Sequence, residues 1–189
     1  GAAAVDELKQ QSADVLAGKP ANPQALAHPI AFNLIPQIGG FLEDGSTSEE
    51  LKVRDESRKI LGMPKLPVTC TAVRVPTVKS HGESVLIEFG TPFDLEHMKA
   101  ALRAHSGITV LDDPKNRVYP MNQTYGVKPE LTVSGTDNVA VGRVRRDLSS
   151  DQGLQLWILS DNLRKGAALN AIQMAEGILP ELLARRTST

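Results

Sequence analysis

The spacing of apolar residues along the chain predicts four helices. The first covers residues 3–17, the second 48–61 and the third 92–105, and the fourth runs through RKGAALNAIQMAEGILPELL. In the first stretch Val5, Leu8, Val15 and Leu16 fall roughly on one helix face. The second helix has the clearest start, because Thr47 and Glu50 have the spacing of a capping box.

Runs rich in Val, Ile and Thr predict about five strands. They lie at residues 67–76, 83–89, 139–146 and 154–160 and in GITVLDD, and residues 30–38 form a further short apolar segment that we expect to be a buried strand or extended. Residues 113–136 read as a long polar loop. In the third helix Leu95, Met98 and Leu102 are expected to face the core.

The order of these elements predicts the fold class. The strands do not alternate strictly with helices, and no glycine-rich turn follows a first strand, which excludes a dinucleotide-binding Rossmann unit within the chain. We therefore predict an α+β domain, with a mostly antiparallel mixed sheet and helices on one face. A length of 189 residues fits one such domain.

Net charge and composition limit the kinds of binding partner and the cellular location that we expect. The net charge is −1, so no basic field indicates nucleic acid or an anionic membrane. The local basic cluster RVRRD at residues 143–147 lacks an aromatic stacking platform and is interpreted as a solvated strand or turn face. No apolar run approaches the ~20 residues of a membrane span, no signal peptide is visible, and we expect no metal site. A single cysteine fits a reducing cytosol, so we expect a cytoplasmic protein.

That cysteine, Cys70, is the first candidate for chemistry. It lies in VTCTAVRVP, where on a strand its side chain would share a face with Ala72 and Arg74. Eleven residues of straight strand would place it about 35 Å from His81, so contact would require the chain to double back. No nearby basic group lowers its pKa. We therefore interpret Cys70 as a small buried hydrophobe and not as a nucleophile.

The stretch VRVPTVKSHGESVLIEF places Arg74 and His81 seven residues apart. An ordinary histidine pKa of about 6.5 suits a general acid or base, and a solvated turn histidine fits the same pattern. The other histidines lie in a loop (His28) or among charged helix neighbours (His97, His105). Arg74 interrupts an apolar run and needs an anion, which is either an internal carboxylate or a substrate carboxylate held by the guanidinium fork.

Two helix starts carry further polar groups. Glu49 and Lys52 are three residues apart in the first turn of the second helix, so they share a face; they are either a surface ion pair or a site for a charged ligand beside the helix N-terminus. In SDNLRKGAALNAIQMAE, Asn162 stands before Arg164, Lys165 and Gly166 at the opening of the last helix. This second group indicates either helix capping with close packing or close approach of a ligand.

Six ordered stretches together resemble one family. They are AFNLIPQI, ESRKILG, VRVPTVKSHGESVLIEF, DDPKNRVYPM, VGRVRRD and SDNLRKGAALNAIQMAE. In this order and spacing they resemble the C-terminal half of bacterial aspartate-semialdehyde dehydrogenase, from the first residues to about residue 180. The resemblance implies the C-terminal fold of glyceraldehyde-3-phosphate dehydrogenase-like enzymes, with substrate binding and dimerisation in one domain. It also implies that the protein forms a homodimer.

The resemblance also implies an activity. The family reduces aspartyl phosphate with NADPH to aspartate semialdehyde and phosphate, toward lysine, diaminopimelate, methionine and threonine. A cysteine thiolate attacks the acyl phosphate, and the thioester then accepts hydride. By resemblance His81 is the acid–base catalyst. Arg74 would bind the substrate carboxylate, Glu49 its amino group and Lys52 the phosphate. Asn162, with Lys165 and Gly166, would reach the NADP cofactor.

The resemblance departs from the family at the nucleophile. The family's NADP-binding Rossmann domain and its cysteine lie upstream of the part that this chain resembles, and Cys70 matches a strand position. We therefore expect this chain alone to be inactive. Three alternatives stay open: a relative acting on N-acetylglutamyl phosphate, which needs no group for a free amine; a catalytically silent interaction module of the same fold; and a stand-alone binding protein.

Overall fold

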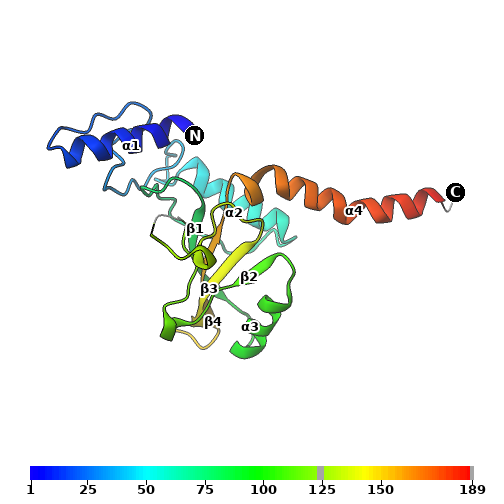
Figure 1. Ribbon diagram of the computed structural model, residues 1–189. Coiled ribbons are helices and arrows are strands. Elements are labelled where there is room, and N and C mark those ends of the chain that lie inside the picture. Colours follow the sequence, from blue (N-terminus) through cyan, green and yellow to red (C-terminus); the bar gives the residue numbers. More distant parts are fainter. Residues whose placement is uncertain (123–125, 188–189) are drawn as a thin grey trace. The chain divides into compact units, whose positions relative to one another are not determined.

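A computed structural model describes residues 1–122 and 126–187 of the chain. The chain divides into two compact units, Gly1–Pro76 and Thr77–Thr189, whose elements are labelled in Figure 1. The expectation of a single substrate-binding and dimerisation domain stays a prediction.

The first unit contains two of the predicted helices. These are α1 (Ala2–Leu16) and α2 (Ser48–Ile60), and their bounds agree with the predicted ranges to within one residue. Polar side chains of α1 hold the loop that follows it. The buried Gln11 accepts hydrogen bonds from the backbone N–H groups of Ile30 and Ala31 at 2.8 and 3.3 Å. Buried backbone donors require such partners, so Gln11 fixes the start of the apolar segment 30–38.

The strand predicted at 67–76 is wrong, and the segment 30–38, expected to be a buried strand or extended, is not a strand. The segments 30–38 and 67–76 form no strand, and they meet only at an isolated antiparallel bridge between Ile35 and Arg74. The physical reason is proline, because Pro36 interrupts one segment and Pro76 ends the other, and a proline offers no N–H to a ladder. Phe32 also has a left-handed backbone, with φ of 56°, which breaks the extended run.

The second unit contains a four-stranded sheet in the order β1-β4-β3-β2 (Figure 1). Its strands are β1 (His81–Glu88), β2 (Ile108–Val110), β3 (Val139–Arg146) and β4 (Gly153–Ser160). β4 is antiparallel to both β1 and β3, and β2 is parallel to β3. The predicted α+β class with a mostly antiparallel mixed sheet is therefore confirmed.

One helix covers the core of this sheet. α3 (Leu95–Ala104) begins where the Asp94 side chain accepts a hydrogen bond from the backbone N–H of His97. Leu95, Met98 and Leu102 pack against buried side chains of β3 and β4, as their spacing predicted. These buried side chains are Val141, Val144, Leu154 and Leu156.

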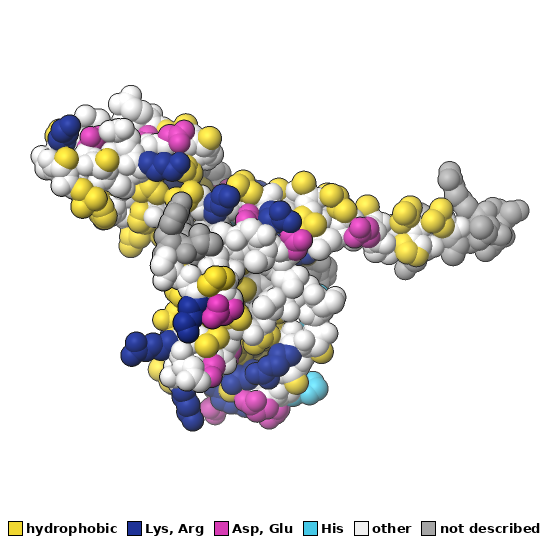
Figure 2. Space-filling model, viewed as in Figure 1, with side chains coloured by type: hydrophobic (Ala, Val, Ile, Leu, Met, Phe, Trp, Pro, Cys, Tyr) yellow, Lys and Arg dark blue, Asp and Glu magenta, His cyan; other side chains and the backbone are white. Residues whose placement is uncertain are grey.

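The long loop predicted at 113–136 contains two short 3-10 turns, η1 (Pro114–Asn116) and η2 (Pro129–Leu131); its residues 123–125 lie outside the described residues. The last helix starts later than predicted. A π turn, η3 (Arg164–Ala168), with a break at Ala167, precedes α4 (Leu169–Thr187). Figure 2 shows apolar side chains exposed along α4. They include Ile172, Met174, Ile178, Leu179 and Leu183.

Candidate functional site

The first turn of α2 carries the predicted pair of charged residues. Thr47 caps the helix, and Glu50 completes a capping box with it, as predicted. Lys52 Nζ lies 3.5 Å from Glu49 Oε1, which confirms that the two side chains share a face. Both are partly solvent-exposed, at 56% for Lys52 and 39% for Glu49. An exposed ion pair of this kind contributes little to stability, so both charges remain available to a ligand.

Arg74 lies in the same unit, and its backbone is fixed to Ile35. Its N–H donates to Ile35 O at 2.8 Å, and Ile35 N–H donates to Arg74 O at 3.0 Å. The side chain is half-buried. Within residues 1–76, all of which the structure describes, no carboxylate forms an ion pair with it. The internal salt bridge that the sequence left open is therefore not found in this unit, where no carboxylate occupies the guanidinium donors.

The other predicted residues belong to the second unit. His81 is the first residue of β1, is exposed, and pairs with Ser160, the last residue of β4. Asn162 follows two residues after Ser160, so antiparallel pairing brings it close to the start of β1. Asn162 Oδ1 accepts a hydrogen bond from Ser80 N at 3.0 Å. The structure therefore places Asn162 in contact with Ser80, the residue before His81.

Ser80 holds an unusual backbone conformation directly before His81. Its φ is 69°, in the left-handed region that residues other than glycine rarely adopt. Besides the bond to Asn162, the Ser80 hydroxyl lies 2.9 Å from the Ser134 hydroxyl. A non-glycine residue keeps such a conformation only where its surroundings fix it, and such residues cluster at functional sites. No local sequence signal identifies Ser80, because its partners are 54 and 82 residues away.

Asp161 anchors the turn that carries the predicted cofactor residues. Its side chain is 2% exposed and accepts hydrogen bonds from Gly135 N at 2.7 Å, Leu163 N at 2.9 Å and Arg164 N at 3.3 Å. Burial alone would raise the pKa of Asp161, but these backbone donors and the nearby charge of Lys79 outweigh it and lower the pKa below its usual range. Sequence analysis missed this residue, although its position directly after a strand in SDNLRKG was a usable signal.

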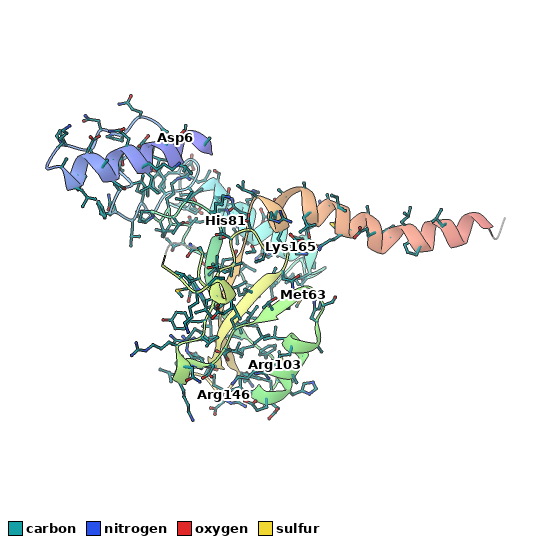
Figure 3. The ribbon with its side chains drawn as sticks, in the orientation of Figure 1. Asp6, Met63, His81, Arg103, Arg146 and Lys165 are labelled. Carbon is teal, nitrogen blue, oxygen red and sulfur yellow. The ribbon has the colours of Figure 1, made fainter. Side chains whose placement is uncertain are left out.

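Lys165 and Gly166 lie in η3, next to Asn162. The Lys165 ammonium donates a hydrogen bond to Gln173 Oε1. A Cβ added at Gly166 would meet only the Asn162 Cβ, at 4.0 Å, so the backbone there is open to a ligand. Figure 3 labels His81 at the start of β1 and Lys165 in η3. Arg164 instead forms an ion pair with Asp137, with Arg164 Nε 2.6 Å from Asp137 Oδ1.

Cys70 is exposed, so the expectation of a buried cysteine is wrong. It lies outside any strand, because the segment that carries it forms no ladder. Partial desolvation of its sulfur and the carboxylates of Glu50 and Glu49 raise the pKa of the thiol. A nucleophilic cysteine needs a lowered pKa, so this raised pKa agrees with the interpretation that Cys70 is not a nucleophile.

The basic cluster at 143–147 lies at the end of β3, and its three arginines are exposed, as predicted. Arg146 stacks over Phe93, with 4.6 Å from its guanidinium carbon to the ring centroid. Arg143 and Arg145 line a hollow of about 390 Å³ with Tyr119 and Trp157. This hollow contains none of the predicted site residues. In the part of the chain that the structure describes, no group of His, Cys, Asp and Glu side chains could hold a metal ion, and none of the helices there has the length and apolar character of a membrane span.

Known proteins resemble the chain over nearly its whole length. An aspartate-semialdehyde dehydrogenase from Prochlorococcus marinus is 43% identical over 179 residues, which cover 95% of this chain and 50% of that protein. One from Synechocystis is 40% identical over 176 residues, covering 93% and 50%. The chain spans about half the length of the relatives it matches.

Solved structures of aspartate semialdehyde dehydrogenases also match the chain over most of its length. The aspartate semialdehyde dehydrogenase II of Vibrio cholerae complexed with ASA matches with a TM-score of 0.84 and 40% identity, covering 94% of this chain and 50% of that one. The Candida albicans enzyme with NADP matches with a TM-score of 0.58 and 25% identity, covering 82% and 46%.

The sequence model of one family, "Semialdehyde dehydrogenase, dimerisation domain", matches residues 1–165. This match covers both units of the chain as far as Lys165, and so includes six of the seven predicted site residues. The chain belongs to the semialdehyde dehydrogenase dimerisation-domain family.

Proposed function

We propose that this chain is the substrate-binding and dimerisation part of an NADP-dependent aspartate-semialdehyde dehydrogenase of amino-acid biosynthesis. The observation that carries the proposal is a set of accessible charges on one unit: the exposed ion pair of Glu49 and Lys52, and the guanidinium of Arg74, which has no carboxylate partner there. A substrate with an ammonium, a phosphate and a carboxylate offers one counter-charge to each of them.

Substrate binding would replace the ion pair between Glu49 and Lys52 with ion pairs to the substrate. Glu49 and Lys52 hold each other at 3.5 Å in the free protein. In the proposed complex Glu49 accepts the substrate ammonium and Lys52 binds the phosphate, so neither charge is left unpaired when the ligand enters. Arg74 holds the substrate carboxylate with two parallel N–H donors, which fixes orientation as well as position.

His81 moves a proton at the reacting carbonyl. A thiolate attacks the acyl carbon, the carbon–oxygen bond to phosphate breaks, and phosphate leaves with the bonding pair. The resemblance assigns that thiol to the half of the family enzyme that precedes the matched part. When the thioester is reduced, His81 donates a proton to the carbonyl oxygen, and it takes that proton back as the aldehyde is released and the thiolate re-forms.

NADPH would supply the hydride when it is bound. Asn162 and the turn η3 that follows it fit such a cofactor, because the Asn162 amide nitrogen makes no hydrogen bond to the described residues while its oxygen is held by Ser80. The open backbone at Gly166 would admit a planar ring. Asn162, Lys165 and Gly166 would hold the cofactor on this side, and they orient it relative to His81 because Asn162 contacts the residue before that histidine.

Two further parts of the proposal concern assembly and location. A family defined by its dimerisation domain supports a homodimer, and β1 supports it too, because Leu86 and Ile87 of this edge strand are 51% and 37% exposed. The free, exposed Cys70 fits the reducing cytosol. These 189 residues alone should show no turnover, because Cys70 is their single cysteine and its pKa is raised.

The test compares two matched ion pairs, each in the first turn of a helix, in the full-length protein. Glu49→Gln should raise the KM for aspartate semialdehyde at least tenfold in the NADP- and phosphate-dependent direction, because the substrate ammonium loses its partner. Glu96→Gln is the control, since Glu96 forms an equivalent first-turn pair with Lys99 at 3.3 Å in α3. Equal effects of both variants would refute the role of Glu49. Full turnover by Glu49→Gln would instead favour a substrate without a free amine.

A further inference from the structure

The carboxylate of Glu50 does more than cap α2. One oxygen, Oε2, accepts a hydrogen bond from Thr47 N at 2.7 Å, which completes the capping box. The other oxygen, Oε1, accepts a hydrogen bond from Ala72 N at 2.9 Å, 22 residues further along the chain. A capping box needs only the first of these bonds. The second bond joins α2 to the segment that carries Arg74.

This tether acts on Arg74 from two residues away. Ala72 is held by Glu50, and Arg74 itself is held by the two backbone hydrogen bonds with Ile35. The segment 67–76 lies in no sheet, so these bonds replace the ladder that would otherwise fix it. Glu50 also follows Glu49 directly and lies two residues before Lys52. Its side chain therefore connects the helix turn that bears two of the proposed ligands to the segment that bears the third.

We propose that Glu50 is a positioning residue, which sets the guanidinium of Arg74 relative to Glu49 and Lys52 by holding Ala72. The inference rests on the proposed function of these three residues. It requires a carboxylate at this position, because both partners are N–H donors and both oxygens must accept. Glutamine satisfies a capping box equally well, but its amide offers only one accepting oxygen.

The ionisation of Glu50 supports this assignment. The hydrogen bonds from Ala72 and Thr47 lower the pKa of Glu50 below its usual range, so both oxygens accept at neutral pH. Binding a carboxylate through a bidentate fork depends on placement to within about half an ångström. Loss of the Ala72 bond should therefore weaken substrate binding more than it changes the chemistry after binding.

The experiment uses Glu50→Gln in the full-length protein. We expect the KM for aspartate semialdehyde to rise about fivefold to tenfold, with the KM for NADP unchanged and kcat within twofold. Thr47→Val is the matched control. It removes the hydroxyl that accepts from Glu50 N at 3.4 Å but leaves both oxygens of Glu50 engaged. It should lower the melting temperature without changing either KM.

A double-mutant comparison of Glu50→Gln with Arg74→Ala distinguishes a positioning role of Glu50 from a general effect on stability. If Glu50 acts through Arg74, Glu50→Gln should add little to the KM of an Arg74→Ala variant, because residues that act as one unit are not additive. Independent, multiplying effects would overturn the inference, as would a Glu50→Gln variant that behaves like Thr47→Val. An unchanged KM in Arg74→Ala itself would overturn the proposed role of Arg74, and the inference with it.

Hydrogen exchange in the unmodified protein gives a test that requires no variant. The N–H groups of Ala72 and Arg74 are bonded to Glu50 and Ile35, whereas Val73 N makes no hydrogen bond to the described residues. We expect Ala72 and Arg74 to exchange at least tenfold more slowly than Val73. Exchange of Ala72 as fast as Val73 would show that the tether does not form in solution and would overturn the inference.

Discussion

Replacing Asp161 by Asn should destabilise the unit that carries His81, although the side chain at position 161 keeps nearly the same volume. The carboxylate accepts from Gly135, Leu163 and Arg164, and Gly135 N is the nearest donor, at 2.7 Å from Oδ2. In the amide variant one oxygen can still accept from Leu163 and Arg164. The new NH₂ group then faces the N–H of Gly135, so that donor loses its partner.

The magnitude follows from these contacts. A hydrogen bond to a charged group contributes about 1.5–3 kcal/mol, and an unsatisfied buried donor costs about 1–3 kcal/mol. Gly135 is an exposed residue, so water can partly replace the lost acceptor, and we expect a loss of about 2 kcal/mol in the free energy of unfolding at pH 7. Asp151→Asn is the control, since Asp151 is exposed and its carboxylate makes no hydrogen bond to the described residues.

The assay is urea unfolding followed by the fluorescence of Trp157, the single tryptophan, which lies in β4 of the same unit. The pKa of Asp161 in the folded protein is lowered from its ordinary 3.8. Its stabilisation is therefore fully present above pH 3.8 and is lost as the pH falls through the lowered pKa. The difference between the wild type and Asp161→Asn should shrink only in that acidic range. A difference below about 0.5 kcal/mol at pH 7, or one that does not change with acid pH, would refute the reasoning.

Three further predictions follow from single sites. Cys70→Ser should leave turnover of the full-length protein unchanged, and Cys70 should react with iodoacetamide more slowly than free cysteine at pH 8, because desolvation and the carboxylates of Glu50 and Glu49 raise its pKa; loss of turnover would contradict this. Gly142→Ala should reduce the unfolding free energy by about 3 kcal/mol or more, because its Cβ would lie 2.2 Å from the Leu111 carbonyl oxygen; an unchanged urea midpoint would exclude this clash. Asn162→Ala should lower kcat about tenfold in steady-state assays with little change in the KM for semialdehyde, through displacement of His81; an effect confined to that KM would contradict it.

The helices could be predicted because their signals are local. The capping box of Thr47 and Glu50 and the apolar stripe of α3 lie within a few residues, and both appear in the structure. The strand predicted at 67–76 is absent, and 30–38 does not form the strand that was one of its two expected forms, because a strand exists only where a partner offers a ladder. Val and Thr favoured a strand at 67–76 and a short apolar run favoured one at 30–38, but only Ile35 and Arg74 pair.

The candidate site likewise has features with a local sequence signal and features that depend on distant residues. Arg74 and His81 were proposed from their residue types and the family resemblance, and the structure adds the backbone partner of each. The left-handed backbone of Ser80 and its bond to Asn162 depend on a partner 82 residues away, which no local pattern reveals. The exposure of Cys70 was missed for a similar reason, because burial on a strand was assumed and the strand is absent.

Both units use the same device beside their predicted site residues. Glu50 follows Glu49 and holds Ala72, and Asp161 precedes Asn162 and holds Gly135, so in each case an acidic neighbour of a site residue binds backbone N–H of a distant segment. A carboxylate suits this task because its two oxygens can join two segments at once. The boundary between the units lies between Arg74 and His81. The groups proposed to grip substrate and the group proposed to move a proton are therefore supported separately, and loss of Glu50 should appear in KM while disturbance of the turn after Asp161 should appear in kcat.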